Sequence, residues 1–448
     1  MGRVVVIGGG IAGIQAALDL GDRGHKVILV EKKPSIGGRM AQLDKTFPTN
    51  DCSICILAPK MLECFDHPNV TVITNAEVKV LDGSAGNYTV TIEKKPRYVD
   101  EDKCTGCGNC AWACRLKDRF PDEFNMGLGK RSSIYLYFIQ AVPRVAIIDD
   151  EHCLMLTKGK CGKSPPCVDV CGPKAIDFEQ KPEEIEVDAD AIIVATGYDF
   201  LDPAQFKEYG YGVYKNVITA LEYERLICAG GPKEGHLLRP SDEQIPKTVA
   251  FIQCVGMRDR GNCPYCCVVC CLNSTKSCIL AKEHYPDIET YVLYSELRAV
   301  GKRSQEYVDR ARNEYGIRYI RGRPGEILED KETNNLLIKY ENIDLGKIER
   351  MEAELVVLNN APVPSTSTKE LAKVLGIAVN ECGFFSPKDP LFHPIETNKE
   401  GIFIIGFAQG PKDIPESVAQ ASAAAAKASE IIKRKEREGG GAGNDSEK

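Results

Sequence analysis

The sequence predicts an α/β protein with two dinucleotide-type domains and an iron-sulfur domain inserted into the first. Three observations lead to this fold class. The chain opens with a βαβ pattern around a glycine-rich turn, its middle holds two cysteine runs with iron-sulfur spacing, and a strand at 249–253 begins a second, cysteine-rich α/β segment. With 448 residues and 43% apolar side chains, the chain is long enough for two or three domains.

The composition argues against several classes of function. The formal net charge is -7, whereas nucleic-acid binding calls for a basic face. No run of about 18 apolar residues could span a membrane, and the start, MGRVVVIGGGIAG, lacks the features of a secretory signal. We therefore expect a cytoplasmic protein without a membrane span. In that reducing compartment, the 20 cysteines favour metal or redox chemistry over a disulfide framework.

The N-terminal segment predicts a dinucleotide site. A β-rich run is followed by the turn Gly8-Gly9-Gly10-Ile11-Ala12-Gly13, an apolar helix pattern and a second strand. In this arrangement Gly8 permits the tight turn, Gly10 lets the backbone approach a pyrophosphate, and Gly13 lets the helix and strand pack closely. The diphosphate would lie at the helix N-terminus. Glu31, at the end of the second strand, is placed to bind the ribose hydroxyls.

Three further landmarks indicate that the dinucleotide is FAD. KPSIGGRM at 33–40 resembles the second diphosphate-contacting loop of flavoproteins with two dinucleotide-binding domains, and AIIVATG at 191–197 resembles their strand-to-turn signature. GIFIIGFAQG at 401–410 is similar to the strand and turn that close over the flavin, and a helix is expected from about 415 to 433. The candidate FAD contacts are Gly8, Gly10, Ala12, Gly13, Glu31, Lys32, Gly38, Arg39, Ala195, Thr196, Gly197, Gly406, Gln409, Gly410, Asp413 and Ile414.

Two cysteine runs predict a pair of [4Fe-4S] clusters. The first run has the spacing of bacterial ferredoxins, in which the fourth cysteine serves the other cluster, and consists of Cys104, Cys107, Cys110 and Cys114. The second run consists of Cys153, Cys161, Cys167 and Cys171. We therefore assign one cluster to Cys104, Cys107, Cys110 and Cys171, and the other to Cys153, Cys161, Cys167 and Cys114.

Structural zinc is the alternative occupant, since zinc also accepts four cysteines. The doubled run with a crossed fourth ligand matches the ferredoxin layout better. Two features depart from that layout. Arg115 stands where proline usually follows the fourth cysteine, and the gaps on either side of Cys161 are longer than two residues. These departures leave the geometry of the second cluster open.

The iron-sulfur segment is expected to interrupt the flavin domain. Strand-like TVTIEKK precedes it and EEIEVDADAIIVATG follows it, and an insertion at a surface loop costs little stability. The expected domains are the FAD domain at 1–95, 181–245 (with a linker) and 361–433, the inserted ferredoxin-like domain at 96–180, a second dinucleotide-type domain at 246–360, and a disordered tail at 434–448.

The second dinucleotide-type domain lacks its phosphate cradle. Its first strand leads into Cys254-Val255-Gly256-Met257 and then into Gly261-Asn262-Cys263-Pro264-Tyr265-Cys266-Cys267-Val268-Val269-Cys270-Cys271. A flavoprotein of the thioredoxin reductase type would carry a second glycine fingerprint for NAD(P)H at this place. We therefore do not expect this chain to oxidise NAD(P)H directly.

Together these motifs resemble the A-type subunit of heterodisulfide reductase, which is the FAD and iron-sulfur component of electron-bifurcating complexes in methanogens and many anaerobic bacteria. The resemblance covers nearly the whole chain and includes FPTNDCSICILAPK at 47–60, PRYVDEDKCTGCGNC at 96–110, FIQCVG at 251–256, the run 265–271 and GFAQGPKDIPESVAQ at 406–420. It implies a third [4Fe-4S] cluster close to the FAD, held by Cys254, Cys266, Cys270 and Cys271. Longer family members carry additional N-terminal sequence and a further C-terminal ferredoxin module.

Eight cysteines remain outside these assignments, namely Cys52, Cys55, Cys64, Cys228, Cys263, Cys267, Cys278 and Cys382. The two beside the third cluster are expected to be bystanders, although either could replace a ligand. The three between 52 and 64 are too few for a cubane unless a partner or a non-cysteine ligand completes it, so we expect structural or interfacial thiols. The other three are isolated and expected to be buried.

The resemblance implies an oxidoreductase component that splits electron pairs at FAD between ferredoxin and a disulfide-reducing partner. The implied partners are B-type and C-type subunits, ferredoxin, a hydrogenase, formate or NADH dehydrogenase module as donor, and a second copy of the chain within the larger complex. One alternative is a confurcating or plain electron-transfer protein that feeds a membrane quinone module. Another is a scaffold with structural clusters. Flavin reduction by a low-potential donor would exclude the scaffold, and copurifying subunits would separate the other two.

Overall fold

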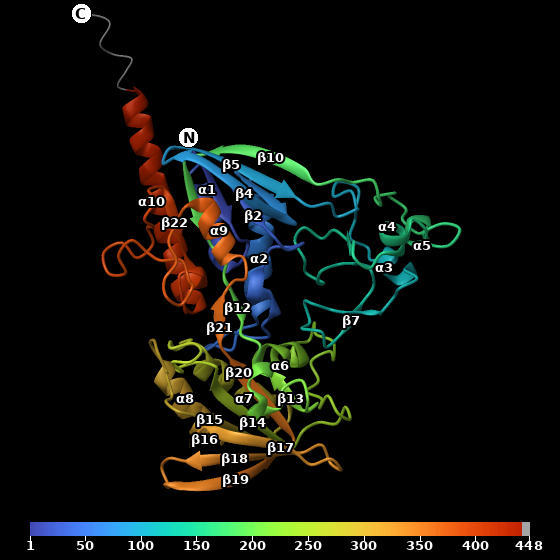
Figure 1. The fold of residues 1–448 in the computed structure, drawn as a ribbon, viewed down its shortest axis with the longest axis vertical. Coiled ribbons are helices and arrows are strands. Elements are labelled where there is room, and N and C mark those ends of the chain that lie inside the picture. Colours follow the sequence, from blue (N-terminus) through green and yellow to red (C-terminus); the bar gives the residue numbers. More distant parts are fainter. Residues whose placement is uncertain (441–448) are drawn as a thin grey trace, which may run out of the picture. The chain divides into compact units, whose positions relative to one another are not determined.

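The computed structural model describes residues 1–440, and Figure 1 shows its fold. The chain divides into two compact units. Unit 1 comprises Met1–Ala41, Leu57–Tyr198 and the chain from Pro364 onward, and unit 2 comprises Gln42–Ile56 and Asp199–Val363. Where the chain crosses between the units, β12 (Tyr198–Phe200) and β21 (Pro362–Pro364) form a two-stranded ladder.

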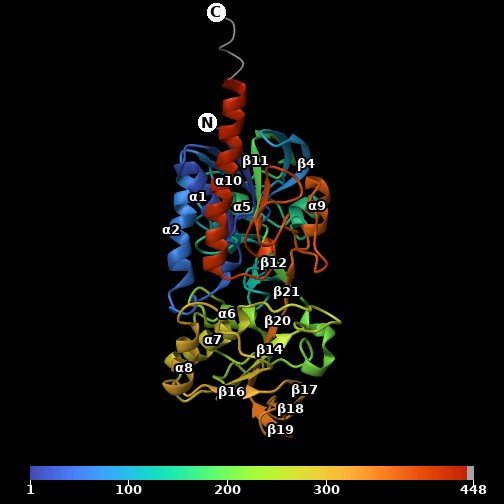
Figure 2. The same ribbon diagram turned by 90° about the vertical axis from the view of Figure 1, so that its left-hand side faces the viewer.

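Unit 1 is built on a five-stranded parallel sheet in the order β22-β11-β1-β2-β3. Its strands are short runs of branched apolar residues, and the side chains at the sheet centre are fully buried, as expected for a parallel sheet covered on both faces. Figures 1 and 2 both show the C-terminal helix alongside α1. The elements are β1 (Arg3–Ile7), α1 (Ile11–Asp22), β2 (Lys26–Glu31), a 3-10 turn (Gly38–Gln42), α2 (Ser53–Asp66), β3 (Val70–Thr74), β11 (Ala191–Val194), α9 (Thr368–Leu375), β22 (Ile402–Ile404), a second 3-10 turn (Gly406–Ala408) and α10 (Ile414–Gly440).

A smaller antiparallel sheet in unit 1 carries the insertion. Its order is β10-β5-β4, with β4 at Ala76–Ser84, β5 at Asn87–Lys94 and β10 at Glu183–Ala189. Strands β5 and β10 pair without interruption from Lys94↔Glu183 to Tyr88↔Ala189. The chain therefore leaves this sheet after β5 and returns to the neighbouring position at β10, so residues 95–182 form an excursion between two paired strands.

The excursion consists of short elements and turns. They are α3 (Asn109–Ala113), β6 (Phe120–Pro121), β7 (Lys130–Arg131), β8 (Ile134–Tyr135), β9 (Ile147–Ile148), α4 (Leu154–Lys158) and α5 (Pro166–Asp169). Its core contains Val99, Ile134 and Ile148, with cysteines from both runs packed against them. A core that includes so many thiols contains few aliphatic and aromatic side chains, as expected for a small domain that is stabilised by bound metal.

Unit 2 repeats the plan of unit 1. A five-stranded parallel sheet in the order β13-β20-β14-β15-β16 is accompanied by an antiparallel meander, β17-β18-β19. In both units the first strand of the βαβ pattern lies third in the sheet, and the strand after the meander returns beside it. The elements are two 3-10 turns (Pro203–Gln205 and Lys207–Tyr209), β13 (Val217–Thr219), α6 (Ala220–Ile227), β14 (Thr248–Val255), α7 (Cys270–His284), β15 (Glu289–Tyr294), α8 (Ser304–Asn313), β16 (Arg318–Arg321), β17 (Pro324–Glu329), β18 (Leu336–Asn342), β19 (Lys347–Ala353) and β20 (Leu355–Asn360).

Two boundaries differ from the sequence expectation. Residues 199–245, expected in the FAD domain, belong to unit 2, because β13 pairs in parallel with β20. The last helix runs from Ile414 to Gly440, so the expected tail at 434–448 begins inside α10, and its remaining residues, 441–448, lie outside the described part. Within residues 1–440, none of the helices combines the length and the apolar character needed to cross a membrane.

Candidate functional site

The glycine turn after β1 is packed too tightly for side chains at two of its positions. Gly8 has φ +109°, and a Cβ there would lie 2.4 Å from the carbonyl oxygen of Ala195. A Cβ on Gly13 would lie 1.9 Å from the carbonyl oxygen of Gly8. These two glycines therefore permit the close approach of β1, α1 and β11, as the fingerprint predicts.

Gly10 is required by neither packing nor backbone conformation. Its φ of -76° suits any residue, and a Cβ built on it would meet only the Cα of Gly38, at 4.0 Å. The loop that contains Gly38 is tied to the turn, since the Gly37 amide donates to the Gly9 carbonyl at 2.7 Å. The two glycine backbones approach each other closely, since a Cβ built on Gly38 would lie 2.9 Å from the Cα of Gly10.

A polar group without a partner lies at the end of the neighbouring strand. The hydroxyl of Thr196, which follows β11, is buried and has no hydrogen-bond partner in the structure. Burying an unpaired hydroxyl costs roughly 1–3 kcal/mol, so such an atom commonly marks a ligand or water position. Together with the facing glycines at 10 and 38, it fits a dinucleotide diphosphate.

Glu31 stabilises the turn through its carboxylate. One carboxylate oxygen accepts the Gly9 amide at 2.6 Å, and the other accepts the Lys33 amide at 2.8 Å. Burial raises the pKa of this carboxyl. Each oxygen retains a second acceptor position, so the predicted contact with ribose hydroxyls remains chemically available.

The predicted C-terminal contacts lie at the start of α10. Asp413 and Glu416 cap this helix reciprocally, each accepting the backbone amide of the other at 2.8–3.1 Å. Gln420 accepts the Gly406 amide and donates to the side-chain oxygen of Gln409. These contacts fix the turn between β22 and α10, and they occupy the backbone amides of Asp413 and Glu416 at the start of the helix.

The remaining predicted FAD contacts have ordinary surroundings. They are Ala12, which is buried, Lys32, whose ammonium donates to Ser365 at 3.4 Å, Arg39 in the 3-10 turn after β2, Ala195 against Gly8, Gly197 and Gly410 with positive φ, and Ile414 as the first residue of α10.

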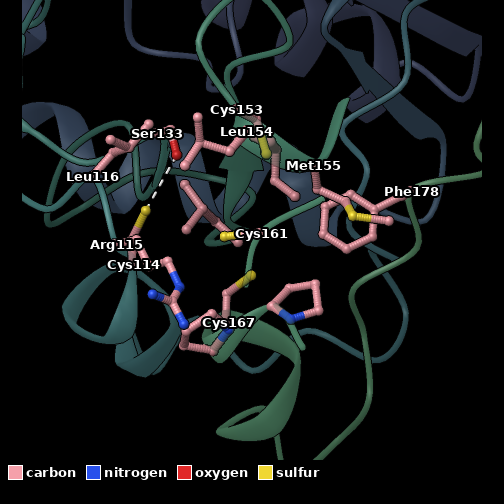
Figure 3. Close-up of a pocket in the computed structure, with 14 residues that line it drawn as sticks. Cys114, Arg115, Leu116, Ser133, Cys153, Leu154, Met155, Cys161, Cys167 and Phe178 are labelled. Carbon is pink, nitrogen blue, oxygen red and sulfur yellow. Dashed lines mark hydrogen bonds between the residues drawn. The ribbon is translucent and has the colours of Figure 1, made fainter. Parts of the chain in front are cut away.

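The four cysteines assigned to the second ferredoxin cluster line one pocket. It encloses about 350 Å³ of empty space, including space open to solvent, and its walls include Cys114, Cys153, Cys161 and Cys167 (Figure 3). The first of these comes from the first cysteine run and the other three from the second run. The crossed ligand set predicted from the sequence is therefore brought together around a single cavity.

Two polar side chains contact the thiols of this pocket. The hydroxyl of Ser133 and the Sγ of Cys114 lie 3.2 Å apart, in hydrogen-bond contact (Figure 3). The guanidinium of Arg115 lines the same pocket, and its positive charge opposes the rise that burial causes in the pKa of the Cys161 thiol. A Cβ on Gly162 would lie 2.4 Å from an Arg115 nitrogen, so the glycine leaves room for this guanidinium. Neither contact was predicted; the only signal was the absence of proline at 115.

The first ferredoxin set is also assembled. Cys110 on α3 interacts electrostatically with Cys104, Cys107 and Cys171, and α3 packs against α5. Burial raises the pKa of Cys110 to about 11 and that of Cys167, in the neighbouring set, to about 12. Thiols with such pKa values are protonated at neutral pH, and a bound cationic metal would convert them to thiolates.

In unit 2, the loop between β14 and α7 gathers five thiols. The Cys270 thiol interacts with the thiols of Cys254, Cys267 and Cys271, which share one buried cluster with it, and the Cys267 thiol interacts with that of Cys266. All four predicted ligands of the third cluster are therefore linked through one contiguous group. The additional member, Cys267, lies inside that group and accepts the Cys270 amide at 3.3 Å.

The backbone of this loop is strained at two positions. Cys254 has φ +60° and Val268 has φ +56°, values rarely adopted by residues other than glycine and least of all by a β-branched one. The loop takes the place that the Gly8 to Gly10 turn occupies in unit 1, between the first strand and the helix that follows. A short phosphate-binding turn is therefore replaced by residues 256–269.

Residues 1–440 contain no group of three or more His, Cys, Asp or Glu side chains in the compact arrangement that binds a single metal ion. A cubane holds its four thiolates farther apart than one ion does, which agrees with the open pocket at the second set.

The other cysteines lie in several environments. Cys52 and Cys55 form a disulfide at the start of α2, and Cys64 on the same helix is buried. Cys263 is buried beside the five thiols. Cys278 is buried as expected, whereas Cys228 and Cys382 are half-buried, so the expectation was wrong for those two.

Comparisons with known proteins agree with this arrangement. A family model for FAD dependent oxidoreductases matches residues 3–51, and a model for the 4Fe-4S binding domain matches residues 97–115. The fold is similar to thioredoxin reductases from Lactococcus lactis (15% identity, TM-score 0.52, 97% of this chain and all of that one) and T. acidophilum (14%, TM-score 0.53, 96% and all). The α/β, thioredoxin reductase-like fold class is thus confirmed.

Curated relatives are much closer in sequence. The chain is 55% identical to the second A-type iron-sulfur subunit of CoB-CoM heterodisulfide reductase from Methanopyrus kandleri, over 96% of this chain and 64% of that protein. It is 53% identical to the corresponding A-type iron-sulfur subunit from Methanocaldococcus jannaschii, over 94% and 63%. The chain thus spans slightly less than two thirds of the length of these relatives. Over nearly all of its own length, however, it is a homologue of the A-type subunit of heterodisulfide reductase, with an FAD oxidoreductase domain and a 4Fe-4S binding domain on one polypeptide.

Proposed function

We propose that this chain is the FAD and iron-sulfur electron-transfer subunit of a heterodisulfide reductase-like complex, and that it carries three [4Fe-4S] clusters. It would pass electrons between a two-electron donor, ferredoxin and a disulfide-reducing partner, dividing each pair at the flavin. Bound FAD would exchange electrons two at a time with a donor and one at a time with the clusters.

The cofactor sites in unit 1 are supported by the chain's own groups. The bare backbone of Gly10 and Gly38 and the unpaired Thr196 hydroxyl would contact the diphosphate of FAD, and the first turn of α10 directly follows the predicted flavin-closing segment in the sequence. In the insertion, the two crossed cysteine sets would hold one cluster each, and the hydroxyl of Ser133 and the guanidinium of Arg115 would donate hydrogen bonds to cluster sulfur.

One observation carries the proposal. The five linked thiols of unit 2 occupy the position at which a nicotinamide-binding relative of this fold would hold pyrophosphate. Replacing a hydride-donor site by thiols that could hold a cluster favours one-electron exchange over direct reduction by NAD(P)H. Among the curated relatives, the Methanococcus maripaludis protein is named as the A-type subunit of an H2/formate:CoB-CoM heterodisulfide, ferredoxin reductase. For this reason we propose ferredoxin and a hydrogenase or formate dehydrogenase module as partners, beside B-type and C-type subunits.

A redox titration of the complex purified without oxygen tests this function. Division of electron pairs requires that the two one-electron steps of the flavin have crossed potentials, so that the flavin titrates as a single two-electron group. Two well-separated one-electron steps, with the first at higher potential, would contradict the dividing role. Copurification of a membrane-bound quinone-linked module in place of B-type and C-type subunits would favour the alternative, a plain or confurcating electron-transfer protein.

A further inference from the structure

The insertion exposes apolar side chains on and beside the two short helices, α3 and α5, that carry cysteines of its two cluster sites. Trp112, the single tryptophan of the chain, lies on α3 between Cys110 and Cys114, and 73% of its surface is exposed. Val168 and Val170, on and beside α5, are also exposed, and α3 packs against α5. Large exposed apolar side chains gathered at one place commonly mark a binding surface.

The segments that carry these apolar side chains are rich in basic residues. Around α3 and between α4 and α5, residues 112–119 and 158–174 contain Arg115, Lys117, Arg119, Lys158, Lys160, Lys163 and Lys174, but only Asp118 and Asp169 as acids. The ammonium of Lys117 lies 3.5 Å from the centre of the Trp112 ring. The lysines at 158, 160, 163 and 174 are exposed and form no ion pair within the described chain. On a chain of net charge -7, this surface, here called the Trp112 patch, is locally basic.

We propose that the Trp112 patch is a docking surface for a small acidic one-electron carrier protein of the iron-sulfur type. Charge complementarity favours an acidic partner, because the basic residues of the Trp112 patch attract an acidic protein and repel a basic one. The exposed Trp112 supplies the kind of large, rigid contact that commonly dominates the binding energy of an interface.

The location of the patch favours an electron carrier over other acidic partners. Cys110 lies on the same short helix as Trp112, and Cys167 lies on α5 beside Val168. A carrier seated there would contact the two helices that bear ligands of both predicted clusters. This inference rests on the proposed function for the presence of the clusters, but the surface itself is defined by the protein residues.

The test measures binding of a purified, acidic two-[4Fe-4S] ferredoxin to the complete cofactor-loaded chain by calorimetry under anaerobic conditions. Two variants alter the patch, Lys160→Glu/Lys163→Glu and Trp112→Ala. Lys302→Glu/Lys331→Glu, which reverses two exposed charges in unit 2, is the matched control. All the substituted positions are exposed, and unchanged iron content and circular dichroism show that each variant is folded. A small basic cytochrome and anionic lipid vesicles serve as the other candidate occupants.

We expect the charge reversal to raise the ferredoxin Kd at least tenfold in about 20 mM salt and less than threefold in about 500 mM salt, where charges are screened. Trp112→Ala should raise the Kd at least tenfold at both salt concentrations, and the control should remain within twofold. Patch variants that bind within twofold of the unaltered chain would overturn the inference, as would equal affinity for the basic cytochrome or preferential binding of the vesicles. If electrons still pass normally from chain to ferredoxin while the patch variants bind unchanged, the docking inference fails and the proposed function stands. If ferredoxin binds as expected but exchanges no electrons with the chain, the proposed function fails and the docking inference stands.

Discussion

Substitution of Gly10 by valine should remove FAD without unfolding the chain. The backbone at this position has φ -76°, which valine adopts without strain, and the added Cβ would lie no closer than 4.0 Å to any neighbouring atom. A side chain in place of glycine restricts the backbone of the unfolded chain. Replacing glycine by alanine at a compatible position stabilises a protein by about 0.4–1 kcal/mol for this reason, and valine at Gly10 should act in the same direction. The flavin-free variant should therefore be at least as stable as the flavin-free natural chain.

The variant should be less stable than the natural chain only when flavin is present. A ligand at a hundred times its Kd stabilises the folded state by about 2.7 kcal/mol, which corresponds to roughly 5–11 °C in Tm for a domain of 150–250 residues. The valine methyl groups would cover the Gly10 backbone that the diphosphate must approach, so the variant should lose most of this flavin-dependent shift.

Flavin content by absorbance and thermal unfolding with and without added FAD measure both effects. Gly230→Val is the matched control, because Gly230 lies in unit 2, has an ordinary φ and has no atom within 4 Å of an added Cβ. Gly13→Val should instead fail to fold, since its Cβ would overlap the Gly8 carbonyl oxygen at 1.9 Å. Full flavin occupancy in Gly10→Val would refute the assignment of the turn to the diphosphate.

Three other outcomes are expected. The loaded chain should contain about twelve irons, and Cys270→Ala should lose about four of them by chemical iron analysis while FAD remains. Because Cys267 could replace Cys270 as a ligand, Cys254→Ala is measured beside it. Full iron content in both variants would exclude a cluster at the five thiols of unit 2. Neither NADH nor NADPH should bleach the flavin of the isolated chain in stopped-flow absorbance, and rapid stoichiometric bleaching by either would contradict the interpretation of the unit 2 loop. Arg115→Gln should lower the reduction potential of one of the two insertion clusters by roughly 30–120 mV. This range corresponds to the Coulomb energy of one charge at about 6 Å in an effective dielectric constant of about 80 to 20. Electron paramagnetic resonance at defined potentials measures the shift, with Lys163→Gln as the control, and an unshifted potential in both clusters would exclude the contact of Arg115 with its thiol.

The sequence was sufficient for those parts of the site that depend on local spacing. The Gly8 to Gly13 turn and the two ferredoxin sets are coded within short segments, and the crossing of Cys114 and Cys171 between the sets follows from the known geometry of doubled ferredoxin runs. The two roles of Glu31 could not be separated in the same way. A carboxylate at a strand end can bind a ribose or the backbone of its own turn, and only the distances from Gly9 and Lys33 show that it does the latter.

Contacts between distant segments were not predictable by the same reasoning. The assignment of residues 199–245 depended on β13, which has three residues and no periodicity of its own, and its pairing with β20 joins positions about 140 residues apart. Ser133 lies in an irregular segment, and no local pattern places its hydroxyl against Cys114. The disulfide between Cys52 and Cys55 was also unexpected, since the reducing compartment inferred from the composition argues against such bonds.

The strained loop of unit 2 gives a physical reason to expect a bound group at the five thiols. Residues held with positive φ cost about 1–3 kcal/mol each and persist only where their surroundings determine the conformation. Cys254 and Val268 are such residues, and they bracket the loop between Gly256 and Cys267. Interactions between thiols are weak and cannot by themselves offset two strained positions. Iron-thiolate bonds would be strong enough to offset this strain, and the predicted ligands are Cys254, Cys266, Cys270 and Cys271. Each strained residue lies at, or within two residues of, one of these ligands, so the bonds would hold the backbone at both positions.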